Sequence, residues 1–139
     1  MPESSVLFDA SRGDIDVRDI PGGVGVVVAL RGDHDLSTKP RVVEALSRLR
    51  RESAVIVIDL RQCTFVDSTI IAVILDAGCR DAPQEPHVSV VLPDDASYVC
   101  RALSVIGLRD LLPVRLSVEA ALEAGSRDCD GGTGHELPR

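Results

Sequence analysis

The chain has 139 residues, of which 45% are hydrophobic and 27% are charged, a composition typical of a folded globular domain. Its formal net charge of −7 argues against a nucleic-acid partner, because neutralisation of phosphates supplies most of that affinity. No apolar run approaches the roughly 20 residues that span a bilayer, and residues 1–5 lack the basic and apolar regions of a secretory signal. We therefore expect one domain, in the cytoplasm and not inserted in a membrane.

The N-terminal third predicts a loose arm followed by a β-hairpin. Residues 1–12 are polar and mixed, and we expect them to form a flexible arm. Polar and apolar side chains alternate over residues 14–20, and residues 24–30 form an apolar run, so both segments predict strands. Pro21-Gly22-Gly23 between them predicts the turn of an antiparallel hairpin.

A helix and a buried strand are predicted next. Leu36-Ser37-Thr38-Lys39-Pro40 has the hydroxyl groups and the early proline that are typical of a helix start. Apolar side chains at positions 42, 45, 46 and 49 then recur at helical spacing. Residues 54–58 are apolar at every position, which predicts a strand covered on both faces.

The segment over residues 70–75 fits two structures. Its β-branched side chains favour a strand, whereas the capping residues before it and its continuation through residue 78 favour a buried helix. We place the helix slightly ahead.

The remaining elements complete an α/β pattern. We expect a strand over residues 87–92, followed by a helix that is capped by residues 94–96, carries Val99, Leu103 and Ile106 on one side and ends at Gly107. A short edge strand within residues 111–114 and a last helix capped by Ser117 follow. Residues 125–139 are expected to form a disordered tail. The chain is thus predicted to be a single α/β domain over residues 13–124, with a mixed sheet of four or five strands and about four helices.

The sequence contains no motif that predicts catalysis, a cofactor or a metal site. Phosphate-binding glycine loops, the serine hydrolase elbow and the zinc protease motif are all missing, so we expect a protein that is not an enzyme. Cys63, Cys79, Cys100 and Cys129 are widely spaced and are interpreted as buried or incidental thiols. A redox-active pair among the first three is a minor hypothesis.

Phe65-Val66-Asp67-Ser68-Thr69 stands at the predicted start of the ambiguous helix, where two roles are open to its polar side chains. Such residues cap helices by accepting hydrogen bonds from free backbone N–H groups. A helix N-terminus also tolerates added negative charge, so a phosphoserine there would change an exposed edge without unfolding the core. If Asp33 and Asp35 share that edge, a phosphate would add repulsion against an acidic or close-fitting partner.

These segments resemble the STAS domain family. Gly32-Asp33-His34-Asp35-Leu36 is similar to the family's G-E-[LI]-D-hydrophobic segment, and residues 57–69 are similar to its signature ending in D-S-[ST]. Residues 99–108 resemble the helix that ends in G-L, and residues 117–122 resemble the closing S-x-x-x-A-L. The ordered set covers about residues 14–124 and implies the STAS fold.

The resemblance also implies a function. Standalone STAS domains of this size are typically anti-sigma factor antagonists, which bind an anti-sigma factor that is also a serine kinase. Phosphorylation by that kinase switches the antagonist off, and a serine phosphatase restores it. By position, Ser68 would be the phosphoacceptor and Thr69 a secondary candidate.

The resemblance further implies a docking surface for a protein partner. We expect binding at this surface to regulate transcription. Its members are Asp33, His34, Asp35, Asp67, Ser68, Thr69 and Ile70. Three of them depart from the family pattern. Ile70 stands where the family usually has glycine, His34 replaces an aliphatic residue, and Asp33 replaces the glutamate of the family segment, which is one methylene longer.

A second function remains open. The chain could be an accessory STAS subunit of a membrane transporter that docks on an ABC ATPase or a permease. In that case Ser68 would serve only as a helix cap, and its replacement by alanine would cost about 1 kcal/mol of stability.

Overall fold

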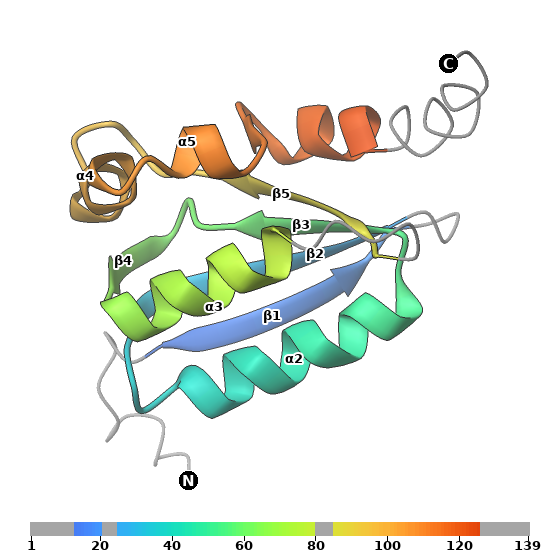
Figure 1. The fold of residues 1–139 in the computed structure, drawn as a ribbon, viewed down its shortest axis with the longest axis horizontal. Coiled ribbons are helices and arrows are strands. Elements are labelled where there is room, and N and C mark those ends of the chain that lie inside the picture. The colour runs from blue at the N-terminus through green and yellow to red at the C-terminus, as the bar shows by residue number, and fades with distance from the viewer. Residues whose placement is uncertain (1–12, 21–24, 80–84, 126–139) are drawn as a thin grey trace, which may run out of the picture.

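The computed structural model describes residues 13–20, 25–79 and 85–125 of the chain (Figure 1). The arm predicted over residues 1–12, the turn at Pro21-Gly22-Gly23 and residues 126–139 of the predicted tail lie outside these ranges. Gly125 was also predicted to belong to the tail, but it is the buried last residue of the final helix. The elements, in chain order, are β1 (Asp14–Asp19), β2 (Gly25–His34), α2 (Lys39–Glu52), β3 (Val55–Asp59), β4 (Cys63–Val66), α3 (Ser68–Gly78), β5 (His87–Val91), α4 (Tyr98–Val105), α5 (Leu108–Leu111), β6 (Val114–Arg115) and a last helix over residues 118–125.

The strands form one mixed sheet, as the sequence predicts. Its order is β1-β2-β3-β5-β6, and β4 also pairs with β2. The hairpin of β1 and β2 is antiparallel, and the other pairs are parallel. The sheet has six strands, whereas four or five were predicted, because β4 was not expected from the sequence. That strand has only four residues, and its partly exposed centre carries no clear apolar run.

Helices α2, α3, α4 and α5 contribute to the main hydrophobic core against one face of the sheet (Figure 1). In α2 the buried residues are those at positions 42, 45, 46 and 49, which confirms the predicted stripe. The ambiguous segment forms α3, and it buries Ile70, Ile74 and Ala77 at helical spacing. Its strong β propensity is overridden because these side chains fill the space between the helix and the sheet.

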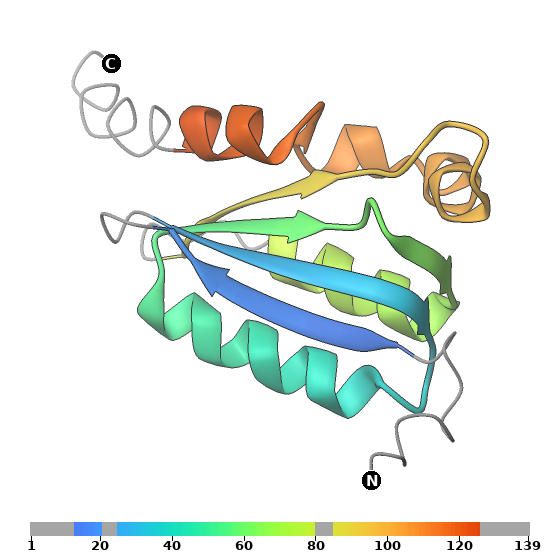
Figure 2. The same cartoon turned by 180° about the vertical axis from the view of Figure 1, so that it is seen from behind.

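The opposite face of the sheet is covered over part of its area by the last helix (Figure 2). Val118 and Ala121 of that helix pack in a smaller core with Val27, Val55 and Val57. Alternate residues of β3 therefore point into different cores, and all five are buried. This arrangement confirms the prediction of a strand covered on both sides.

The region after β5 differs from the prediction in three details. Helix α4 is capped by Ser97, whose hydroxyl accepts a hydrogen bond from the backbone N–H of Cys100 at 3.0 Å, and not by residues 94–96. Of the three residues predicted on the apolar side of this helix, Val99 and Leu103 are buried, but Ile106 follows α4 and is 40% exposed. Gly107 has a φ of 78° and ends the helix as expected, but α5 begins directly after it and was not predicted.

Candidate functional site

The carboxyl ends of β2 and β4 lie side by side and bring the predicted acidic residues together. The two strands are parallel, with Asp33 opposite Phe65 and His34 opposite Val66. The backbone N–H of Asp67 donates a hydrogen bond to the carbonyl oxygen of His34 at 3.3 Å. The loop after β2 therefore meets the start of α3, and we call the edge formed by Asp33, Asp35 and Asp67 the acidic rim.

Asp67 is the cap of α3. One oxygen of its carboxylate accepts hydrogen bonds from the backbone N–H groups of Thr69 at 3.0 Å and Ile70 at 3.1 Å, and from the hydroxyl of Thr69 at 2.6 Å. These hydrogen bonds hold the pKa of Asp67 below its usual value, and the bond from the Thr69 hydroxyl has the largest effect. Desolvation raises the pKa but does not offset them. The carboxylate thus occupies backbone donors that would otherwise be free for an anion.

Ser68 and Thr69 occupy different environments at this helix start. Ser68 is exposed, and its hydroxyl has no hydrogen bond within the described part of the chain. Thr69 is only partly exposed, and its hydroxyl is held by Asp67. The interpretation of Ser68 as a helix cap is therefore wrong, since Asp67 fills that role, and the Ser68 hydroxyl is open to an incoming protein.

The other two rim carboxylates are held by hydroxyl groups. The Thr64 hydroxyl donates to Asp33, and the backbone N–H and hydroxyl of Ser37 donate to Asp35 at 2.9 and 2.6 Å. The Ser37 bonds lower the pKa of Asp35, against a repulsion from Asp67 that raises it. The carboxylates of Asp35 and Asp67 are thus close enough to interact through their charges, and Asp67 directly precedes Ser68.

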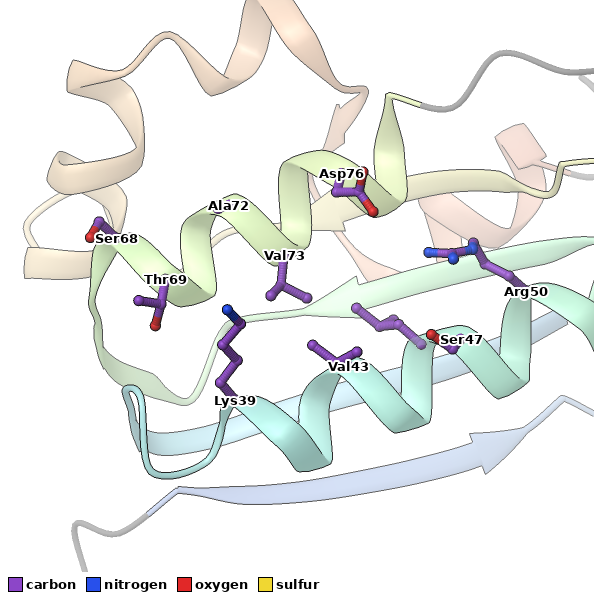
Figure 3. A pocket seen from close by; sticks show the side chains of 10 residues that line it. Lys39, Val43, Ser47, Arg50, Ser68, Thr69, Ala72, Val73 and Asp76 are labelled. Carbon is purple, nitrogen blue, oxygen red and sulfur yellow. The ribbon is translucent and has the colours of Figure 1, made fainter.

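A groove of about 510 Å³ runs between α2 and α3 and begins at Ser68 and Thr69 (Figure 3). Its walls combine apolar side chains in the middle with a cation from α2 near each end, Lys39 and Arg50. The sequence analysis did not predict this groove, because it arises from the packing of two helices. Its remaining lining residues are Val43, Leu46, Ser47, Ala72, Val73 and Asp76.

Exposed apolar side chains flank the rim and were also missed by the sequence analysis. Leu36, in the loop after β2, is 65% exposed. Tyr98 is 48% exposed and stacks on Phe65 of β4, with ring centroids 5.4 Å apart. Aromatic and aliphatic side chains held rigidly beside a polar rim are typical of protein-binding surfaces.

His34 is not part of the exposed surface, contrary to the prediction that it contacts a partner. Its side chain is 0% exposed. Nε2 lies 3.2 Å from the carbonyl oxygen of Asp14 and 3.1 Å from that of Arg31, so it carries the proton, and Nδ1 lies 3.0 Å from the Thr38 hydroxyl. A Cβ at Gly13 would approach the imidazole ring within 2.6 Å, so only glycine fits there. The imidazole therefore joins β1, β2 and the start of α2.

Ile70 is also removed from the predicted docking surface. Its side chain is fully buried in the main core. The bulk that replaces the family's usual glycine thus points toward the sheet and not toward an approaching protein.

Burial of His34 predicts a stability that depends on pH. Desolvation lowers the pKa of the imidazole below 6.5, against the two carbonyl oxygens, which raise it. The unfolded chain then binds the proton more readily, so the free energy of unfolding should fall as the pH drops through about 6.5 toward 5. Urea denaturation at several pH values measures this slope. The His34→Gln variant should show a smaller slope over the same interval, and an unchanged slope in that variant would exclude His34 as its source.

A family model described as "Mlab, STAS domain" matches residues 22–113, which is well over half of the chain. The chain is a member of the STAS domain family. Comparison with curated protein sequences finds no match.

Solved structures show the same fold as this STAS domain. An anti-sigma factor antagonist from Mycobacterium paratuberculosis is 23% identical with a TM-score of 0.73, and the match covers 86% of this chain and 99% of that one. The antagonist SpoIIAA in its unphosphorylated form is 15% identical with a TM-score of 0.62, covering 86% and 97%. The phosphorylated Bacillus SpoIIAA is 14% identical with a TM-score of 0.54, covering 80% and 98%.

The STAS domain offers little for redox or metal chemistry in its described residues. Cys63, Cys79 and Cys100 are free thiols, and burial raises the pKa of Cys63 to about 11, which suppresses the reactive thiolate. No three His, Cys, Asp or Glu side chains of the described residues gather as a metal site requires. Among the same residues, no helix has the length and apolarity needed to cross a membrane.

The cap assignment in this STAS domain predicts different effects for two adjacent substitutions. Asp67→Ala removes the acceptor for two backbone N–H groups and should lower the free energy of unfolding by about 1–2 kcal/mol. Ser68→Ala removes no hydrogen bond among the described residues and should change it by less than about 0.5 kcal/mol. Chemical denaturation of both variants measures the difference, and a loss in Ser68→Ala equal to that in Asp67→Ala would contradict the assignment.

Proposed function

We propose that this STAS domain is an anti-sigma factor antagonist that binds an anti-sigma factor with serine kinase activity and is released when Ser68 is phosphorylated. The protein would act by binding and not as an enzyme, in the cytoplasm, with a serine phosphatase resetting it. The observation that carries the proposal is the exposed Ser68 hydroxyl, which has no hydrogen-bond partner within the described ranges and lies beside the acidic rim. Family membership and the fold shared with proteins described as anti-sigma factor antagonists support it.

The surroundings of Ser68 fit a switch that acts on the partner and not on the fold. A phosphoryl group carries nearly two negative charges at neutral pH. Two backbone N–H groups of the first turn of α3, those of Thr69 and Ile70, are already bound to Asp67, so they are not available to the phosphate. Its charge would add to that of Asp35 and Asp67 and repel a partner that fits closely against the unmodified rim.

The groove and the apolar flanks supply the binding energy in this proposal. Val43 and Val73 line the groove in the middle. Leu36, which follows Asp35 in the chain, and Tyr98, which stacks on Phe65, are exposed. A partner segment placed across α2 and α3 would bury these apolar side chains and would contact Ser68 at the end of the groove. Binding and access of a kinase to Ser68 would therefore involve the same surface.

Thr69 is a weaker candidate for phosphorylation than Ser68. Its hydroxyl donates to Asp67 at 2.6 Å and its side chain is only partly exposed. Transfer of a phosphoryl group to Thr69 would require breaking that hydrogen bond and disturbing the cap of α3.

Phosphorylation of the purified protein by its anti-sigma factor kinase, with magnesium and ATP, tests the proposal. Peptide mass spectrometry should find one phosphate at Ser68 in the wild type and in the Ser104→Ala control, and none in Ser68→Ala. Ser104 is an exposed serine on α4 and controls for unspecific labelling. If the protein binds a partner but position 68 never receives phosphate, the proposal is wrong and the transporter-subunit hypothesis gains support.

A further inference from the structure

Lys39 is a cation of the groove between α2 and α3 and has no charged partner there. It is the first residue of α2 and is half-buried, and its side chain extends toward α3 (Figure 3). Among the described residues, no carboxylate lies within ion-pair distance of its ammonium group. Asp76, the acidic residue of the groove lining, lies toward the end at Arg50 (Figure 3), and Arg50 is paired with Glu85 at 3.9 Å. Lys39 is therefore the cation of the groove that is available to a new anion.

The start of α2 does not compensate the charge of Lys39. The N-terminal end of a helix carries a partial positive charge, which disfavours basic side chains in the first turn, and the first turn of α2 contains no acidic residue. Arg41, the other cation of that turn, donates a hydrogen bond to the carbonyl oxygen of Gly13 at 3.1 Å. No such bond from the Lys39 ammonium group is present within the described part of the chain. In the free protein this charge is therefore stabilised by solvent.

The side chain of Lys39 stands next to the apolar middle of the groove. Val43 of α2 and Val73 of α3 form that middle (Figure 3). Val43 is 38% exposed and Val73 is half-buried. A protein segment that packs on both valines also covers Lys39 and removes water from its ammonium group. Because a charge that loses its hydration without gaining an anionic partner opposes binding, the segment must bring an anion with it.

We infer that the partner segment in the groove presents an aspartate or glutamate carboxylate to Lys39 and apolar side chains to Val43 and Val73. The inference rests on the proposed function, because it names the chemistry of the segment with which the partner docks. The apolar contacts supply affinity, and the ammonium–carboxylate pair fixes the position of the segment along the groove. A protein that carries a basic residue at this place is rejected by Lys39.

Lys39 is the only lysine of the chain, so this contact can be mapped by crosslinking. A water-soluble carbodiimide joins a lysine amine to a carboxylate in contact with it, and peptide mass spectrometry identifies both residues. In the complex with the proposed anti-sigma factor partner, Lys39 should form an isopeptide bond with one aspartate or glutamate of that partner.

Moving the lysine along α2 provides the matched control for the crosslink. Lys39→Arg keeps the positive charge but has no amine that reacts, so this variant should bind the partner and lose the product. Adding Arg48→Lys to Lys39→Arg places the lysine at an exposed position of α2 outside the groove lining. No crosslink to the partner should form from position 48.

The affinity for the partner is the second readout. Lys39→Gln should weaken binding about tenfold, and Lys39→Glu about a hundredfold, because the glutamate places like charges together. Arg48→Gln and Arg48→Glu make the same changes of charge outside the groove and should stay within about threefold of the wild type. The difference between the wild type and Lys39→Gln should shrink in about 1 M salt.

Two results would overturn the inference and leave the proposed function intact. One is a complex in which no crosslink forms at Lys39, and the other is wild-type affinity in Lys39→Gln. If the wild type does not bind the anti-sigma factor at all, the proposed function is wrong and the inference falls with it.

Discussion

Replacing Ser68 by glutamate is expected to weaken binding of the proposed anti-sigma factor partner by about a hundredfold, whereas Ser68→Ala should bind within about threefold of the wild type. The glutamate adds a negative charge and bulk beside Asp35 and Asp67, and like charges placed together at an interface cost several kcal/mol. A hundredfold loss corresponds to about 2.8 kcal/mol. Isothermal titration calorimetry with the purified anti-sigma factor measures both affinities.

The control for these variants is the same pair of substitutions at Ser104, an exposed serine of α4. Neither Ser104→Glu nor Ser104→Ala should change the affinity by more than about threefold. Chemical denaturation should show that all four variants stay folded. If neither substitution at Ser68 changed the affinity, Ser68 would not be part of the docking surface.

Filling the groove should have a comparably large effect without adding negative charge. Ala72 is an exposed alanine of α3 that lines the groove, and arginine is a good helix former. Ala72→Arg should therefore leave the fold intact and occupy the space between α2 and α3. We expect the affinity for the anti-sigma factor to fall at least about tenfold, because the apolar walls are no longer accessible to a docking segment.

Ser104→Arg on α4 is the matched control for this substitution, since it adds the same side chain to an exposed helix position outside the groove. It should bind as the wild type does. If Ala72→Arg bound with unchanged affinity while its unfolding transition matched that of the wild type, the groove would not be part of the docking surface.

The sequence predicted best those elements whose signal is local. The spacing of Val42, Leu46 and Leu49 predicted α2, and the unbroken apolar run of β3 predicted a strand between two layers. Strand β4 was missed because it owes its structure to pairing with β2, and the four-residue α5 because it follows the turn at Gly107 directly.

The acidic rim could be predicted as a hypothesis, since strands that are parallel and adjacent place their carboxyl ends together. The sequence could not predict which residues of the rim face solvent. His34 lies between Asp33 and Asp35 in the sequence, yet its side chain is buried with three hydrogen-bond partners within about 3.2 Å. Ser68 and Asp67 are both ordinary capping residues, and only the folded structure shows that Asp67 caps the helix while Ser68 stays exposed.

The groove and Lys39 depend on tertiary packing and had no sequence signal of their own. The groove exists because α2 and α3 pack against the same face of the sheet. A lysine beside Pro40 at a helix start is unremarkable in a sequence. Its place in the wall of the groove, on the side of α2 that faces α3, becomes visible only when the two helices are placed side by side (Figure 3).

Hydrogen exchange of the protein bound to the proposed anti-sigma factor partner tests most directly where that partner binds and what controls its binding. Amides at the start of α2, in the loop that precedes it and in the first turns of α3 should be protected in the complex. Phosphorylation of Ser68 should remove that protection. Protection confined to α4, α5 and the last helix, or protection at the groove that survives complete phosphorylation of Ser68, would contradict the account.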